Sequence, residues 1–95
     1  MARNEILSLT AGSTVELSAA DITRITFQNH GPGVIEVIAT TGATPTAAQS
    51  GPRYTAREGE AGISLSDLAP GVAGAVRLFA RTYKSGASEV FVSHA

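Results

Sequence analysis

Two apolar stretches joined by a glycine-proline turn occupy residues 22–40, which read ITRITFQNHGPGVIEVIAT. In the first stretch Ile25 and Phe27 fall on one face and polar residues fall on the other, and this period of two predicts a β-strand. The motif His30-Gly-Pro-Gly33 places two glycines around a proline, which is typical of a turn. Because an apolar run then returns as far as Thr40, we expect a β-hairpin or a tight strand–turn–strand unit.

The same alternation extends to both sides of this unit. Short runs of alternating polarity predict further strands at residues 5–10, 13–17, 53–57, 63–66, 75–83 and 88–93. Residues 84–87 predict a hairpin turn between the last two strands, and residues 66–71 predict one helical turn that Pro70-Gly71 ends. About seven to eight short strands predict a single all-β domain over residues 1–95, folded as an antiparallel β-sandwich or a jelly-roll-like barrel.

Residues 41–62 interrupt the strand pattern. Their first part, residues 41–52, consists mostly of small uncharged residues and contains two prolines. Glu58-Gly-Glu-Ala-Gly62 predicts a turn at the other end. We therefore expect an extended loop near residues 41–62, and a loop of this length in a compact domain commonly has a function.

The composition excludes several classes of function. The chain has 95 residues with seven Lys or Arg, eight Asp or Glu and no Cys, which excludes a disulfide framework and thiolate metal sites. The basic residues are scattered, so we expect neither nucleic acid nor membrane as a partner, and we expect no signal peptide. A charged fraction of 16% is low, and a surface so poor in charge is suited to burial in an assembly.

Candidate catalytic and metal-binding residues are few. His30 lies in the glycine-proline turn and His94 lies at the penultimate position, where fraying is expected, and neither has the spacing of a metal-binding pair. Glu58 and Glu60 lie in a predicted turn and offer too few oxygen ligands for Ca²⁺. The chain also has no nucleophile elbow and no phosphate loop. We therefore expect no catalytic residue, no cofactor, no metal and no enzyme activity.

Several predicted strands are apolar on both faces, which an antiparallel sheet with one solvated face does not require. In the strand that begins at residue 34, both faces carry Val or Ile, and later strands place phenylalanines opposite their other apolar residues. A second apolar face can pack against another subunit or under the 41–62 loop, and a domain this small has little chain to cover it. We therefore predict a protein interface that contains Val34, Ile38, Pro45, Tyr54, Arg77, Phe79 and Phe91.

Three stretches resemble small β-rich structural proteins of tailed bacteriophages and prophages. They are Ile25-Thr-Phe-Gln-Asn29 with the turn after it, the small-residue stretch Gly42-Ala-Thr-Pro-Thr-Ala-Ala48, and the closing strand Glu89-Val-Phe-Val-Ser-His-Ala95. The resemblance implies a virion component, and specifically a capsid decoration or cement protein on the outer face of a phage head. It implies a homotrimer, with the major capsid protein or another virion protein as partner, and arms formed by residues 1–8 and by the 41–62 loop. It carries over no catalytic residue.

Other functions fit the same sequence. The chain could take another virion position, as a tail, baseplate or head-fibre-anchoring component. A small carbohydrate- or ligand-binding β module would need a concave site with convergent polar groups, and a cupin-like enzyme would need metal-binding histidines. We expect the protein to be made in the host cytoplasm and to reside on the capsid surface of the virion.

Overall fold

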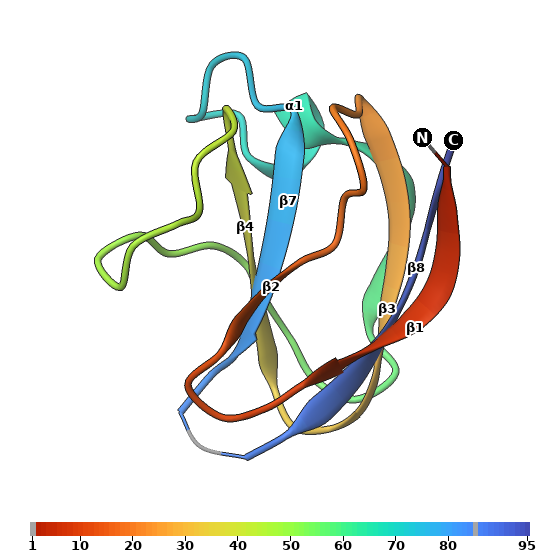
Figure 1. Ribbon diagram of the computed structural model, residues 1–95, viewed down its shortest axis with the longest axis vertical. Coiled ribbons are helices and arrows are strands. Elements are labelled where there is room, and N and C mark those ends of the chain that lie inside the picture. The colour runs from red at the N-terminus through yellow and green to blue at the C-terminus, as the bar shows by residue number, and fades with distance from the viewer. Residues whose placement is uncertain (1, 85) are drawn as a thin grey trace.

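The structure, a computed structural model, describes residues 2–84 and 86–95. Two four-stranded antiparallel sheets pack against each other (Figure 1). The elements are β1 (Arg3–Leu9), β2 (Thr14–Glu16), β3 (Arg24–Pro32), β4 (Ile35–Thr40), β5 (Arg53–Tyr54), β6 (Gly59–Ser64), the single helical turn α1 (Leu65–Leu68), β7 (Arg77–Thr82) and β8 (Ser88–His94). The all-β sandwich that the alternating sequence predicts is confirmed.

The strands are ordered β1-β8-β3-β6 in the first sheet and β2-β7-β4-β5 in the second. Among these strands, only β4 and β5 are neighbours both in the chain and within one sheet. The chain otherwise crosses between the sheets or to a non-adjacent position at every step. This is the arrangement of a double-sheet jelly roll, and the two sheets do not close into a barrel.

For residues 22–40 the tight strand–turn–strand alternative describes the structure and the β-hairpin alternative is wrong, and the hairpin predicted between the last two strands is wrong as well. The turn at residues 30–33 does reverse the chain, but β3 lies in the first sheet and β4 in the second. The same holds for β7 and β8, whose predicted turn at residues 84–87 includes Ser85, which lies outside the described residues. A turn motif reverses the chain in both arrangements, whereas burial of the apolar faces between two sheets decides which strands pair.

Two predicted irregular segments contain strands. The predicted arm at residues 1–8 is strand β1 from Arg3 onward, paired with β8 at the edge of the first sheet because Leu7 and Leu9 pack into the core; Met1 lies outside the described residues. The predicted loop at 41–62 is a loop only up to residue 52, and β6 begins at Gly59, where the sequence predicts a turn. Gly59 lies so close to the carbonyl of Phe27 that a side chain has no room, so this glycine permits close strand pairing.

The core lies between the two sheets. Its largest fully buried side chains include Leu17, Phe27, Ile35, Leu78 and Val92. Tyr54 of β5 packs edge-on against Phe27, with 5.0 Å between the ring centroids, and its hydroxyl donates a hydrogen bond to Glu60 at 3.1 Å. Burial, and after it the charge of Glu60, raises the pKa of the Tyr54 hydroxyl well above its usual range.

Asn29 fixes the crossing from β3 to β4. Its side chain is fully buried, and its amide nitrogen donates to the carbonyls of Gly33 at 2.7 Å and Tyr54 at 3.0 Å. Its oxygen accepts from the backbone N–H of Gly31 at 2.8 Å and from the Ser88 hydroxyl at 2.6 Å. All four hydrogen-bonding positions of the amide are therefore occupied, and the neighbouring residue 30 is directed outward.

Candidate protein-binding face

The outer face of the second sheet is covered by residues 41–52 of the same chain, which we call the strap. It lies beside β4 on the side away from the first sheet (Figure 1). The strap leaves β4 after Thr40, and the guanidinium of Arg81 binds its carbonyls at Thr46, at 3.0 Å, and at Gln49. Since Thr40 and Arg81 lie toward opposite ends of this sheet, the strap passes over the residues between them.

A buried ion pair anchors the strap. The Glu36 side chain on β4 is 6% exposed and accepts a hydrogen bond from Nε of Arg81 at 3.0 Å. The other carboxylate oxygen of Glu36 accepts from the backbone N–H of Gly51 at 3.3 Å and lies 3.8 Å from Nε of Arg53. The Glu36 carboxylate on β4 therefore contacts β7 through Arg81, the end of the strap through Gly51 and β5 through Arg53. These contacts hold the strap in place.

The outer face of the first sheet has no such cover. No described segment crosses it, and it forms the side of the molecule opposite the strap (Figure 1). We call it the open face. Strand alternation and pairing show which residues of the four strands face outward on this side. They are Asn4, Ile6, Ser8, Arg24, Thr26, Gln28, His30, Gly59, Ala61, Gly62, Ser64, Glu89, Phe91 and Ser93. On these four strands, only Arg24 and Glu89 among the outward residues carry a charge.

Two apolar side chains lie side by side on the open face, on the edge strand β1 and its neighbour β8. Ile6 of β1 is 52% exposed and is the one large hydrophobic side chain that is exposed among the described residues. It is the register partner of Phe91 on β8, which is partly exposed. The ring of His30 stacks on Phe91 with 6.3 Å between the centroids. Exposed apolar groups in a charge-poor surrounding are typical of a protein contact.

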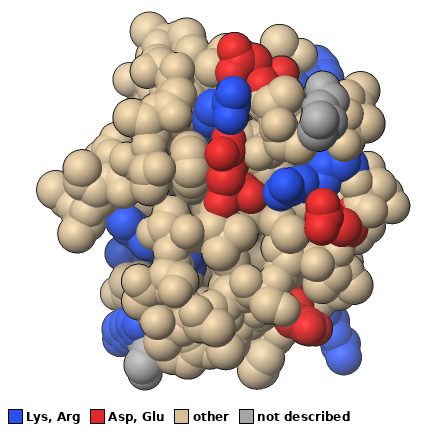
Figure 2. Space-filling model, in the orientation of Figure 1, with Lys and Arg blue, Asp and Glu red and all other residues tan. Residues whose placement is uncertain are grey.

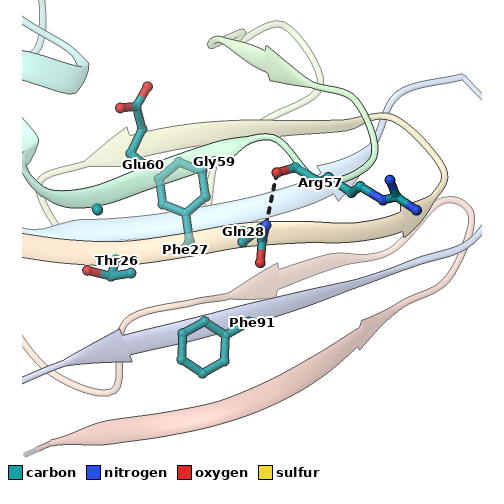
Figure 3. A pocket seen from close by; sticks show the side chains of 8 residues that line it. Thr26, Phe27, Gln28, Arg57, Gly59, Glu60 and Phe91 are labelled. Carbon is teal, nitrogen blue, oxygen red and sulfur yellow. Dashed lines mark hydrogen bonds between the residues drawn. The ribbon is translucent and has the colours of Figure 1, made fainter.

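A shallow hollow lies beside Phe91 on the β6 side of the face. It has a volume of about 310 Å³, and its wall includes Thr26, Gln28, Gly59 and Ala61 (Figure 3). Gln28 donates its side-chain amide to the carbonyl of Arg57 at 3.0 Å, while the Arg57 guanidinium extends away from Phe91 (Figure 3). The lining also includes Phe27, Arg57 and Glu60. Because the Gln28 amide and the Glu60 carboxylate are already bonded to groups of the same chain, the hollow suits an apolar side chain of another protein better than a polar small ligand.

Charges elsewhere on the surface largely neutralise each other. Figure 2 shows acidic and basic groups side by side in a band, with wide uncharged areas around it. Arg77 pairs with Glu16 at 2.8 Å and with Asp21 at 2.7 Å, and these hydrogen bonds, that of Glu16 first, raise the pKa of Arg77. The face seen in Figure 2 therefore offers no large patch of a single sign that would attract a polyanion.

The seven predicted interface residues do not share one surface. Phe91 lies on the open face, whereas Ile38 and Phe79 are opposite each other under the strap and are 3% and 5% exposed. Pro45 is a buried residue of the strap and Tyr54 belongs to the core. Val34 lies at the β3–β4 crossing, and Arg77 takes part in the ion pairs described above. Contact of any of them with a second chain stays a prediction.

Sequence reasoning missed Ile6. The alternation from Glu5 to Thr10 contains the signal, because Leu7 and Leu9 share one face and Ile6 shares the other with Ser8. His30 was weighed only as a turn residue, and its contact with Phe91 depends on the pairing of β3 with β8. That pairing joins strands more than 50 residues apart and has no local signal.

The histidines and carboxylates of the described residues do not form a cluster of metal ligands or a frayed end. In the described part of the chain, no three His, Cys, Asp or Glu side chains gather as metal ligands would. His94, expected to fray, is instead buried in β8, and its Nε2 accepts a hydrogen bond from the backbone N–H of Ala19 at 3.0 Å. Among the described residues, no helix has the length and apolar character that a membrane span requires.

A comparison of the chain with protein-family models, with curated proteins and with solved structures finds no significant match. The features of the protein that bear on its function are therefore its jelly-roll topology and the residues of the open face.

Proposed function

We propose that this chain is a structural protein of a phage virion, a capsid decoration protein that stabilises the head through protein–protein contacts. In this proposal the open face is its contact surface with another protein subunit. The single observation that carries the proposal is the exposed Ile6 beside the partly exposed Phe91 on an almost uncharged sheet face.

The fold supports this proposal by analogy. Double-sheet jelly rolls are common in viral capsid domains, although they also occur in lectins and cupins, so the topology alone does not assign a function. The resemblance of three sequence stretches to virion structural proteins points in the same direction. The contrast between the two outer faces adds a physical reason, because the chain covers one apolar face with its own strap and leaves the other uncovered.

The test is binding to assembled heads. We would purify heads formed by the major capsid protein encoded in the same genome, add the chain in increasing amounts, and measure the fraction that sediments with the heads. The proposal predicts saturable binding by the wild-type chain. Ile6→Arg should weaken this binding about tenfold or more, because it replaces the exposed apolar side chain of the contact with a charge.

The matched control is Ala43→Arg, which adds the same charge to an exposed strap residue on the other side of the molecule. It should bind like the wild type. Absence of wild-type binding would contradict the decoration role. Equal binding by Ile6→Arg and Ala43→Arg would contradict the assignment of the open face as the contact surface.

A further inference from the structure

We propose that the occupant of the open face is a second copy of this chain, related by a two-fold axis that runs along the strands between β8 and β3. The inference rests on the proposed role of the open face in binding protein, and it goes further by naming the partner. The trimer that the sequence resemblance implies would not have this symmetry. In a two-fold contact the same surface must be complementary to itself.

The strand register provides this self-complementarity. Pairing places Ile6, Phe91, Gln28 and Gly59 in one row across β1, β8, β3 and β6. A two-fold axis through the middle of the row brings the β1 end of one copy over the β6 end of the other. The exposed Ile6 of each copy then projects into the other copy's hollow beside Gly59 and Ala61, so the dimer contains two such contacts.

The middle of the row is complementary as well. The two-fold axis places Phe91 of each copy over Gln28 of the other, so that the two Phe91 rings lie on either side of the axis. Neither copy has a large side chain at Gly59, and none can be accommodated there because of the Phe27 carbonyl. The hollow that receives Ile6 is therefore a fixed feature of the backbone.

Charges on the face agree with the same axis. In the row next to Phe91, Gly31 of β3 pairs with Glu89 of β8, so the axis brings Glu89 of one copy over the His30–Gly31 segment of the other. A histidine ring can donate a hydrogen bond to a carboxylate. Arg24, the other charged residue of the face, comes over the end of β8 and meets no second arginine. Neither Arg24 nor Glu89, the two outward charged residues of these strands, opposes a like charge across the axis.

The area of the face sets the expected strength. Strands about 4.8 Å apart and about seven residues long give each face about 440 Å², so a pair would remove about 900 Å² from water. Stable interfaces usually exceed about 1,200 Å² in total. We therefore expect a weak dimer that becomes fully populated where many copies are concentrated on one surface.

The experiment is sedimentation equilibrium of the full chain over concentrations up to about 1 mM, a range that covers weak interfaces. The proposal predicts a monomer–dimer equilibrium. Ile6→Arg and Ala61→Phe, which would fill the hollow, should each raise the dissociation constant about tenfold or more. Ala43→Arg on the strap should leave it unchanged. Thermal unfolding of each variant checks that the chain still folds.

A charge exchange tests the axis while Ile6 and Phe91 themselves stay unchanged. Glu89→Arg should weaken the dimer because an arginine cannot accept a hydrogen bond from His30, and the double variant Glu89→Arg with His30→Glu should restore it by exchanging the two sides of the contact. A monomer at every concentration, a trimer, or a dimer that these substitutions do not affect would overturn the inference. If the wild type stays monomeric while Ile6→Arg still loses binding to heads, the face binds a capsid protein, and only the two-fold pairing fails.

Discussion

Asn29 shows how a single side chain can determine the path of the main chain. Two of its four hydrogen bonds fix the residues of the Gly31–Gly33 crossing, and the other two connect that crossing to Tyr54 of β5 and Ser88 of β8. The sequence motif indicates that the chain turns here. It does not indicate that Asn29 holds the turn, because two of its partners lie 25 and 59 residues away.

Replacing Asn29 tests this role. Asn29→Ala should lower the free energy of unfolding by about 2–4 kcal/mol, because it leaves buried donors and acceptors without partners. Asn29→Asp should be at least as harmful, since a carboxylate cannot donate to the carbonyls of Gly33 and Tyr54. Urea unfolding measures both, with Gln28→Ala as the exposed neighbouring control, expected to change stability by less than about 0.5 kcal/mol. An Asn29→Ala variant as stable as this control would refute the role.

At the scale of the element, the sequence predicts strands well and their partners poorly. Alternation places strands at most of the positions where the structure has them, and the helical turn expected within residues 66–71 begins at Leu65 after the cap Ser64. The predicted hairpins fail because the same turn residues serve a return within one sheet and a crossing to the other. The strap shows the same limit. Its composition predicts a loop, whereas its position depends on Arg81, which lies 35 residues from Thr46 in the sequence, and on the ion pair of Arg81 with Glu36.

The strap's close approach to β4 can be tested with glycine substitutions. A Cβ on Gly51 would collide with the carbonyl of Val37, whereas a Cβ on Gly71 would meet nothing. Gly51→Ala should therefore destabilise the chain by about 2 kcal/mol and make the strap more sensitive to limited proteolysis. Gly71→Ala should change neither property. Equal protease sensitivity and stability in the two variants would mean that the strap is not held against β4.

At the scale of the whole molecule, the two outer faces of one sandwich differ. Both carry apolar residues, and the sequence predicts Phe79 and Phe91 alike as interface residues. The structure separates them, because Phe79 lies under the strap and Phe91 remains partly exposed beside Ile6. Which face a loop covers follows from the three-dimensional path of the chain and not from local composition. The part of the candidate site that sequence alone could have provided is therefore Phe91 and, from its alternation, Ile6.

The most direct test of the open face as a protein contact uses single cysteines, because the chain has none of its own. Gln28→Cys places a thiol on the open face and Ala43→Cys places one on the strap, and both positions are exposed in the single chain. The rate of maleimide labelling is measured for each variant, free at low concentration and bound to heads. We predict that binding slows labelling of Gln28→Cys about tenfold or more, because a protein contact excludes solvent and reagent, and leaves Ala43→Cys unchanged. Unchanged labelling of Gln28→Cys on heads would contradict the central claim.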